Sequence, residues 1–451
     1  MTVTISPIPI VTADSKPCGL IVGPDKSILH RLLILGSLTR SLIRIPIRSI
    51  ESLSHDVLAT VLGLESLGVP IEITSDEIEL QGVGRHGFRA PGHTINCANS
   101  GTTARLLMGL LAGQSFESTL AGDRSLSARP MKRLADLLVG MGAAIETTAT
   151  GSLPVKIKGR ALKASEITLP VASAQMKTSL LLAALFADGR TSIREPLQSR
   201  DHTERMMTAF GYDLVAEPDR WIRLEPSVPD DLEEEFVYEV PGDISSAAFG
   251  VVAGILLHKH TELKNVSLNP TRTRYLDILA LMGVEFEATN VRDSFGEARG
   301  DLHVYGDRMD GPLAPFEITP DDVPLLLDEI PILATLALFA DGTSTIRGAR
   351  ELRVKETDRL RCLAQQFTAF GAEIAEVEDG LSIVGIPNRT LRACAIDHGG
   401  DHRLVMAFAI AGLFADNTVT VPEAEIAAVS YPEFFEHLAA LAGEHQITYQ
   451  R

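Results

Sequence analysis

Basic side chains recur at the starts of long apolar stretches in a chain that is otherwise acidic. The formal net charge is −18. The N–H groups at a helix N-terminus attract anions, and arginine binds carboxylate or phosphate through two parallel hydrogen bonds. The pattern therefore predicts a small ligand that carries several negative charges. The cations are Lys26, Arg31, Arg105, Arg129, Lys177, Arg200, Lys355, Arg359 and Arg403.

Carboxylates accompany some of these cations. Glu356 stands between Lys355 and Arg359, and Asp328 with Glu329 precedes an apolar stretch. A carboxylate beside cations stays ionised, so it can accept a proton during a reaction. The same residues could also be a helix cap at Asp328 and a surface ion pair between Glu356 and Arg359. The residues alone leave both interpretations open.

The composition is that of a folded protein with a large core. The chain has 451 residues, of which 45% are hydrophobic, so we expect two or more domains. The acidic balance argues against a nucleic acid or an anionic membrane as the main partner. The four cysteines show no paired spacing, the N-terminus does not resemble a secretory signal, and the apolar runs are shorter than the ~20 residues of a membrane span. We therefore expect a cytoplasmic protein.

The elements that must position the charges are repeated six times. Each copy begins with an apolar stretch typical of a buried helix, followed by a strand, an amphipathic helix that ends at a glycine, and another strand. Glycine suits a helix C-terminus because it accepts positive φ. The apolar stretches are residues 24–38, 99–113, 173–189, 243–257, 328–342 and 400–416, and the glycines are Gly68, Gly142, Gly211, Gly283, Gly371 and Gly443.

Six units could form one solenoid or two closed sets of three. An acidic, proline-containing segment at residues 225–236 precedes the fourth unit, so we place the boundary near Pro241–Asp243 and expect the acidic run to be a solvated loop. The longest interval between the glycines contains extra segments at residues 290–301 and 310–317. We expect both of these to be surface loops.

Nothing in the sequence indicates a metal or a nucleotide cofactor. His398 and His402 have a spacing that metal ligands use, but Gly399 and Gly400 between them disfavour a helix that presents both. There is no Walker A loop and no dinucleotide-binding glycine pattern. We therefore predict no metal site and no cofactor.

Several segments resemble, in order, the signatures of the 5-enolpyruvylshikimate-3-phosphate (EPSP) synthase family. ELRVKETDR and SRDHTER are the most specific, and the resemblance runs from about Gly19 to Phe435. The segments are residues 99–113, 125–131, 173–189, 199–205, 241–249, 325–334, 351–360 and 401–407.

The resemblance implies an α/β fold with two domains, each an inside-out barrel of three βαβαββ units. Residues 23–242 would form one domain, inserted into a second domain made of residues 1–22 and 243–451. The active site would lie in the cleft between the domains, which close on the substrates. We also expect a monomer.

The implied reaction moves the enolpyruvyl group of phosphoenolpyruvate (PEP) to the 5-hydroxyl of shikimate-3-phosphate and releases phosphate. It passes through a tetrahedral intermediate without a metal or a covalent enzyme adduct. One proton must reach the PEP methylene carbon and another must leave the hydroxyl. Both substrates are anions, which accounts for the cations.

The resemblance also assigns roles to residues. Asp328 would be the base on the 5-hydroxyl, and Lys26 and Glu356 would handle the methylene proton, with their division of labour left open. Contacts to shikimate-3-phosphate would come from Lys26, Ser27, Arg31, Ser173, Gln175, Ser199, Arg200, Asp328 and Lys355. Contacts to PEP would come from Lys26, Gly101, Arg129, Gln175, Arg359 and Arg403.

The chain departs from the family pattern at some positions, none of which we assign to catalysis. They leave open a related enolpyruvyl transferase that acts on another phosphorylated cyclic alcohol. The departures are Gly23 and Pro24, which are exchanged, and Leu29, Ala98, Arg124, Ala128, Arg274 and Val429.

Two further alternatives fit the residues less well. A UDP-N-acetylglucosamine enolpyruvyl transferase would carry a loop cysteine near Asp123–Arg124, which this chain lacks. A non-catalytic anion-binding relative would not need the acid–base set of Lys26, Asp328 and Glu356.

Overall fold

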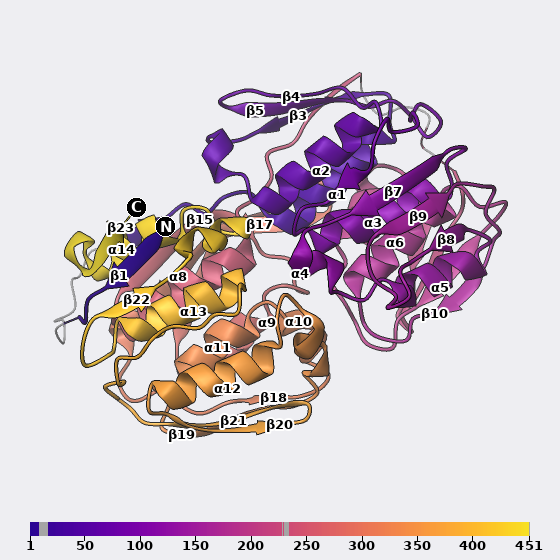
Figure 1. Cartoon of the computed structure of the whole chain (residues 1–451). Coiled ribbons are helices and arrows are strands. Elements are labelled where there is room, and N and C mark those ends of the chain that lie inside the picture. Colours follow the sequence, from indigo (N-terminus) through magenta and orange to yellow (C-terminus); the bar gives the residue numbers. More distant parts are fainter. Residues whose placement is uncertain (9–16, 228, 230–233, 451) are drawn as a thin grey trace. The chain divides into compact units, whose positions relative to one another are not determined.

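The computed structural model describes residues 1–8, 17–227, 229 and 234–450 (Figure 1). The chain forms two compact units. Unit 1 consists of Met1–Gly23, Pro241–Arg292 and Ala298–Arg451, and unit 2 consists of Pro24–Val240 and Asp293–Glu297. Each unit has its own hydrophobic core.

Unit 2 contains three four-stranded sheets within its described residues. In each, the first two strands in space are parallel and the remaining neighbours are antiparallel. The sheets are β14 (Glu235–Val237), β3 (Leu42–Pro46), β5 (Glu77–Gln81) and β4 (Ile71–Ile73); β6 (Ile95–Asn96), β7 (Glu117–Ala121), β9 (Val155–Lys158) and β8 (Ala144–Glu146); and β10 (Glu166–Thr168), β11 (Thr191–Arg194), β13 (Trp221–Leu224) and β12 (Leu214–Ala216).

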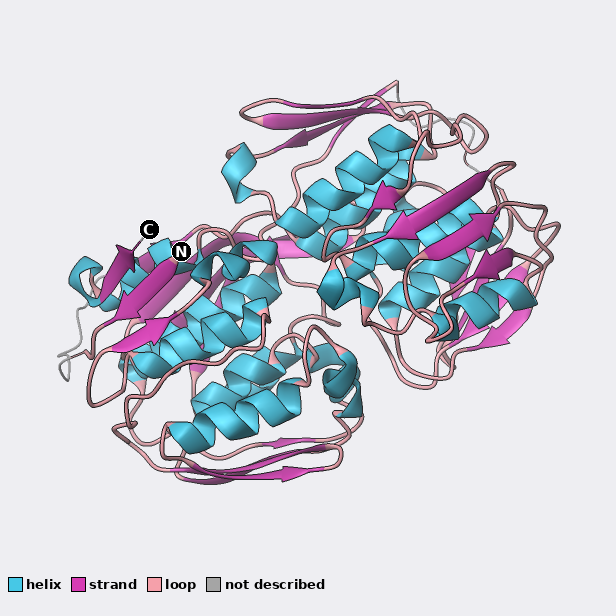
Figure 2. Cartoon of the chain, viewed as in Figure 1, coloured by secondary structure: helices cyan, strands magenta, loops and turns pink. Residues whose placement is uncertain are grey.

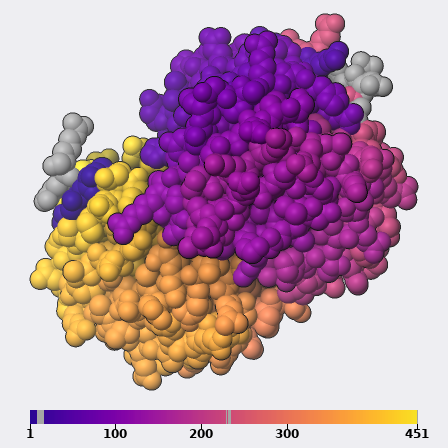
Figure 3. Space-filling view, turned by 45° about the vertical axis from the view of Figure 1, so that its right-hand side comes forward, coloured from indigo at the N-terminus to yellow at the C-terminus, as the bar shows by residue number. Residues whose placement is uncertain are grey.

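Unit 1 contains two four-stranded sheets and one three-stranded sheet in the part of the chain that the structure describes. The three-stranded sheet joins the chain ends, because β1 pairs with both β22 and β23. In the space-filling view, the indigo N-terminal residues accordingly lie against the yellow C-terminal ones (Figure 3). The sheets are β16 (Glu285–Ser294), β17 (Glu297–Tyr305), β15 (His260–Ser267) and β2 (Cys18–Leu20); β18 (Glu317–Ile318), β19 (Gly342–Ile346), β21 (Gly380–Gly385) and β20 (Glu373–Val377); and β22 (Val419–Val421), β1 (Thr2–Ile5) and β23 (Ile447–Gln450).

Helices fill the interior of each unit and the sheets lie outside them (Figure 2). The predicted apolar stretches form the most buried helices, and every residue of α8, α11 and α13 is buried. The helices of unit 2 are α1 (Lys26–Ser37), α2 (His55–Ser66), α3 (Gly101–Ala112), α4 (Arg124–Ser127), α5 (Lys132–Gly140), α6 (Ala174–Ala184) and α7 (His202–Ala209); those of unit 1 are α8 (Ile244–Leu256), α9 (Arg274–Leu281), α10 (Val323–Leu326), α11 (Ile330–Ala337), α12 (Arg359–Ala369), α13 (His402–Gly412) and α14 (Phe434–Ala442). No helix among the described residues is both long and apolar enough to cross a bilayer.

The repeated glycines end helices in the conformation that the sequence predicts. Their φ angles lie between +85° and +104°, a region in which a side chain is strained. Each therefore marks the point at which an outer helix stops, and a strand follows, after a short 3-10 helix (Glu444–Gln446) in the case of Gly443. They are Gly68, Gly142, Gly211, Gly283, Gly371 and Gly443.

Two loop predictions are wrong. Residues 290–301 belong to the hairpin of β16 and β17, because Phe295 and Gly296 both have positive φ and form a two-residue turn that matches the twist of paired strands. In the acidic segment, Glu235 and Phe236 belong to β14, and Phe236 packs 4.7 Å from Phe295 between ring centroids. The rest of that acidic run, residues 230–233, lies outside the described residues. Residues 310–316 are irregular, as predicted.

Candidate active site

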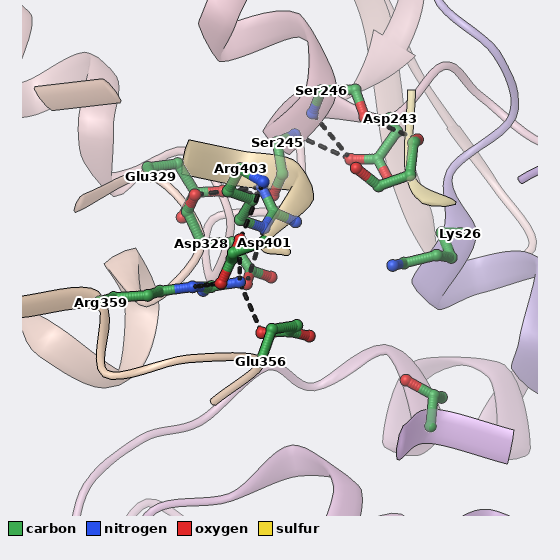
Figure 4. Close-up of polar contacts among 12 residues, drawn as sticks. Lys26, Asp243, Ser245, Ser246, Asp328, Glu329, Glu356, Arg359, Asp401 and Arg403 are labelled. Atoms are coloured by element: carbon green, nitrogen blue, oxygen red, sulfur yellow. Dashed lines mark hydrogen bonds and ion pairs between the residues drawn. The ribbon is translucent and has the colours of Figure 1, made fainter. Parts of the chain in front are cut away.

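A buried arginine organises the charged residues of unit 1. Arg359 is the first residue of α12, and its side chain is 1% exposed. Its Nε lies 2.7 Å from Oδ2 of Asp401, and its Nη2 lies 2.7 Å from Oε2 of Glu356 (Figure 4). Burial alone would lower the pKa of Arg359, but Asp401 and Glu356 raise it above its usual value. The guanidinium is therefore a fixed positive charge.

Asp328 lies between this arginine and a second one. Nε of Arg403 is 3.2 Å from Oδ1 of Asp328, and Nη1 of Arg403 donates to the Asp328 carbonyl at 3.0 Å. Nη1 of Arg359 is 3.8 Å from the same Oδ1. Asp328 remains 21% exposed, whereas Arg403 is 4% exposed. The carboxylate is thus held in place by cations while solvent still reaches it.

These contacts exclude the ordinary interpretations of both carboxylates. Helix α11 begins at Ile330 with Glu329 at its N-cap and no side-chain capping bond, so Asp328 is not the cap. Glu356 and Arg359 do form an ion pair, but Arg359 is buried, so the pair is not a surface one. Lys355 directly precedes Glu356 and follows a short 3-10 helix, Arg350–Val354.

A second polar cluster supports the first. Arg272 donates to Oδ1 of Asp243 at 3.1 Å and to Oγ of Ser245 at 2.6 Å, and Ser245 donates to Glu329. Asp243 also caps α8 by accepting from the backbone N–H of Ser245 at 2.8 Å. All four residues are buried. Because Glu329 adjoins Asp328 in the chain, this cluster fixes the backbone that carries Asp328.

In unit 2, Lys26 is the first residue of α1. Asp25 caps this helix by accepting from the N–H of Ile28 at 3.0 Å. Nζ of Lys26 lies 2.8 Å from Oδ2 of Asp56, which belongs to α2. His30 lies one turn further along α1 and is fully buried. Burial is the main reason that its pKa lies well below the usual value, and the positive charge of Lys26 lowers this pKa further. The positive charge of this helix start therefore belongs to Lys26 and not to the imidazole.

Arg31 joins three helices of unit 2. Its Nε donates to Oγ1 of Thr203 at 2.7 Å and its Nη2 donates to Oγ1 of Thr178 at 3.0 Å. Its Nη1 donates to the carbonyl of Ser27 at 2.9 Å. The side chain is 3% exposed. Arg31 therefore fixes Ser27 relative to α6 and α7.

The N-terminus of α3 carries another group of predicted residues. Gly101 is its first residue, and an added Cβ there would lie 2.9 Å from Nη1 of Arg105 and 3.3 Å from Nη1 of Arg129. Nη1 of Arg105 donates to Oε1 of Gln175 at 2.7 Å, and Nη2 of Arg129 donates to Oδ1 of Asn99 at 2.6 Å. Two guanidinium groups and a helix N-terminus thus lie together, an arrangement suited to an anion.

The remaining predicted residues of unit 2 lie at the starts of α6 and α7. Ser173 caps α6 by accepting from the N–H of Met176 at 3.4 Å, and Ser199 and Arg200 precede Asp201, the N-cap residue of α7. Ser199 is 2% exposed and donates to Glu195. The expectation that Lys177 would face a ligand is wrong, because its side chain is fully buried and paired with two glutamates.

Sequence reasoning missed Asp56, Asp401, Arg272 and Glu195. Asp56, Asp401 and Glu195 contact the predicted residues Lys26, Arg359 and Ser199, which lie 30, 42 and 4 positions away in the chain. Arg272 donates to Ser245, which in turn donates to Glu329 beside Asp328. The one available signal was position, since Asp401 stands two residues before Arg403 as the cap of α13. Among the described residues, no group of three or more His, Cys, Asp or Glu side chains is placed to hold a metal.

A model of the family described as EPSP synthase (3-phosphoshikimate 1-carboxyvinyltransferase) matches residues 18–438. The 3-phosphoshikimate 1-carboxyvinyltransferase of Parasynechococcus marenigrum (strain WH8102) is 45% identical over 430 residues, covering 93% of this chain and 94% of that protein. The enzyme of the same name from Geobacillus kaustophilus (strain HTA426) is 42% identical over 431 residues, covering 94% of this chain and 97% of that protein.

Solved structures agree in fold. The EPSP synthase of Acinetobacter baumannii superposes with a TM-score of 0.81 at 38% identity, covering all of both chains. The enolpyruvyl transferase NikO of Streptomyces tendae gives a TM-score of 0.75 at 19% identity over 100% of this chain and 98% of that one, a likeness of fold alone. These relatives share the whole length of the chain and therefore both units that carry the clusters. The chain belongs to the EPSP synthase family, the 3-phosphoshikimate 1-carboxyvinyltransferases.

Proposed function

We propose that the two groups of residues described above carry out the family's reaction in this chain. The activity is the transfer of the enolpyruvyl group of PEP to the 5-hydroxyl of shikimate-3-phosphate, with release of phosphate, a step of the shikimate pathway. The assignments of individual residues below are proposals, and so are a monomeric state and a cytoplasmic location.

PEP is held by arginines whose side chains are already fixed. Arg359 and Arg403 of unit 1 and Arg129 of unit 2 are each less than 10% exposed, and each is hydrogen-bonded to protein groups. Donors that are oriented before the substrate arrives stabilise developing charge without having to reorganise. Gly101 lets the ligand approach the N-terminus of α3, with Gln175 beside it.

Three residues move protons. Asp328 accepts the proton of the 5-hydroxyl, because two neighbouring arginines favour its ionised form and its carboxylate remains accessible. Glu356 and Lys26 act on the methylene group of PEP. Both side chains are held in position by hydrogen bonds, Glu356 to Arg359 and Lys26 to Asp56, which supports a role for each in a directed proton transfer.

Shikimate-3-phosphate is bound by hydroxyl, amide and cationic groups, most of which lie at helix starts. Lys26 and Ser27 begin α1, and Ser173 and Gln175 lie at the start of α6. Arg31 is buried and holds the starts of α1, α6 and α7 together through its hydrogen bonds to Ser27, Thr178 and Thr203. Ser199 and Arg200 precede α7. Asp328 and Lys355 of unit 1 complete the set.

The observation that carries this proposal is the position of Asp328, 3.2 Å from one buried arginine and 3.8 Å from another that also holds Glu356. One cluster thereby contains both the arginines that would bind an anion and the carboxylate that would accept a proton. The test is phosphate release from PEP by the purified protein without added metal. We expect release only when shikimate-3-phosphate is also present. Binding of both substrates without release would contradict the catalytic assignment.

The departures from the family pattern do not favour a different acceptor. Leu29 is fully buried and belongs to the apolar core of unit 2, so packing accounts for a leucine at this position. Ala98 adopts a φ of +47°, the left-handed conformation that a glycine would take there, so the backbone path is kept. Arg274 pairs with Asp277 and Asp322.

A further inference from the structure

A buried ion cluster in unit 2 adjoins Ser199, and none of its three residues binds a substrate or moves a proton in the proposed reaction. Nζ of Lys177 lies 2.8 Å from Oε2 of Glu195 and 2.6 Å from Oε1 of Glu204. The side chains of Lys177, Glu195 and Glu204 are 0%, 2% and 8% exposed. Two carboxylates share one ammonium group, so the cluster carries one surplus negative charge when both are ionised.

Ser199 is one of the residues proposed to bind shikimate-3-phosphate, and we place the phosphate group of that ligand at its hydroxyl, so Ser199 connects the cluster to the ligand. Its hydroxyl donates to Oε1 of Glu195, and a serine hydroxyl has only one proton to donate. A phosphate dianion offers only acceptors, so it needs the same proton. Glu195 and the substrate's phosphate group therefore compete for one hydrogen bond from Ser199.

The competition has one resolution that keeps both Glu195 and Ser199 hydrogen-bonded. If Ser199 simply turned to the phosphate, Glu195 would lose a donor while buried, which is unfavourable. If Glu195 instead gains a proton, its new O–H donates to Oγ of Ser199 and the serine hydroxyl turns to the phosphate. The proton also cancels the surplus charge of the cluster, which would otherwise repel the dianion.

The surroundings allow such a proton to arrive and stay. Glu195 and Glu204 both line a cavity of about 560 Å³ in unit 2, which gives water a path to the carboxylates. Burial raises the pKa of Glu204 despite the opposing effect of Lys177, so negative charge is disfavoured in the interior of this cluster. The other charged or titratable groups on the surrounding elements include Arg31, Arg194, Arg200, Asp201, His202, Arg205, Glu217, Arg220, Arg223 and Glu297.

We propose that binding of the phosphate group of shikimate-3-phosphate is coupled to uptake of one proton by Glu195. Glu195 is thereby a positioning residue that sets the direction of the Ser199 hydroxyl. The proton comes from solvent, a carboxyl O–H forms, and the O–H of Ser199 stays intact and reorients. The inference rests on the proposed placement of the phosphate at Ser199.

The test is calorimetric titration of shikimate-3-phosphate into the protein at about pH 8 in two buffers with different ionisation enthalpies. Because the second pKa of a phosphate monoester is about 6, the free ligand is a dianion there. We expect the wild type to take up close to one proton, and its affinity to fall by up to about tenfold per pH unit as the pH rises further. A wild type that binds without proton uptake would overturn the proposal.

Glu195→Gln separates proton coupling from structural support. Lys177 only donates, so the amide oxygen must face it and the amide N–H must face Ser199, as a protonated Glu195 would. We expect this variant to bind without proton uptake and with an affinity that is nearly independent of pH. Uptake equal to that of the wild type would refute the assignment to Glu195. Glu217→Gln is the matched control, because Glu217 lines the same cavity but pairs with Arg223, and it should keep the wild-type proton count.

Ser199→Ala tests separately whether Ser199 binds the phosphate group and whether that binding is coupled to proton uptake. The substitution keeps Lys177, Glu195 and Glu204 in place. We expect weaker binding of shikimate-3-phosphate and no proton uptake. Unchanged affinity in this variant would show that Ser199 does not bind the phosphate, which refutes the site assignment and the coupling together. Weaker binding with undiminished proton uptake would refute the coupling alone.

Discussion

Gly101 allows two guanidinium groups to lie over the start of α3. A methyl group in Gly101→Ala would meet Nη1 of Arg105 at 2.9 Å and Nη1 of Arg129 at 3.3 Å, so both side chains must move. Because a small displacement of the groups that position a substrate weakens their contacts with it, we expect the KM for PEP to rise by about tenfold or more. Steady-state kinetics with varied PEP measure this. Gly92→Ala, with open space around the new methyl, should leave KM unchanged.

Lys26 and Glu356 are the groups proposed to handle the methylene proton. Loss of a positioned acid or base lowers turnover by about 10²-fold or more. We therefore expect Lys26→Ala and Glu356→Gln each to lower kcat by that factor while the fold is kept. Lys132→Ala is the control for the lysine, because Lys132 also pairs with an aspartate but is 66% exposed. Turnover near the wild-type value in either variant would remove that residue from the catalytic set.

The sequence predicted the charged residues better than their partners. Arg359, Arg403, Asp328 and Glu356 were found from their positions at unit starts and from the family pattern, and in unit 1 they lie together. Asp56 was not found, because its contact with Lys26 exists only once α1 and α2 pack. Lys177 was misjudged, since a sequence shows the charge of a lysine but not its burial.

The outer helices end at glycines for a conformational reason. Gly283 has a φ of +93° and open space around a new Cβ, so Gly283→Ala tests backbone strain alone. We expect a loss of about 1 kcal/mol in the free energy of unfolding. Gly140→Ala in α5 also has open space but an ordinary helical backbone, and it should be neutral or stabilising by up to about 1 kcal/mol. Denaturant titration of both variants measures this, and equal effects would contradict the explanation.

At the scale of elements, periodicity and end signals predicted the regular units but not the departure from them. The six glycines and the apolar helices were correct because each depends on local sequence. The β16–β17 hairpin was missed because its charged residues, such as Arg292 and Asp293, resemble those of a loop. Its pairing comes from the turn at Phe295 and Gly296 and from packing of Phe295 against Phe210, with ring centroids 4.5 Å apart.

At the scale of the whole molecule, each unit has a hydrophobic core made of its own residues. Units with separate cores can unfold as separate cooperative blocks. We expect scanning calorimetry to give a calorimetric enthalpy larger than the van't Hoff enthalpy, with shikimate-3-phosphate shifting the transition of unit 2. A single two-state transition with equal enthalpies would contradict this expectation.

We propose that the arginine–carboxylate clusters direct the enolpyruvyl group of PEP to one hydroxyl of shikimate-3-phosphate. The most direct measurement is nuclear magnetic resonance of the product formed from isotope-labelled PEP and shikimate-3-phosphate. We expect the label to appear in an enolpyruvyl ether on the 5-oxygen, and we expect Asp328→Asn to form this ether far more slowly. Label recovered only as pyruvate, or undiminished ether formation by the Asp328 variant, would contradict the account.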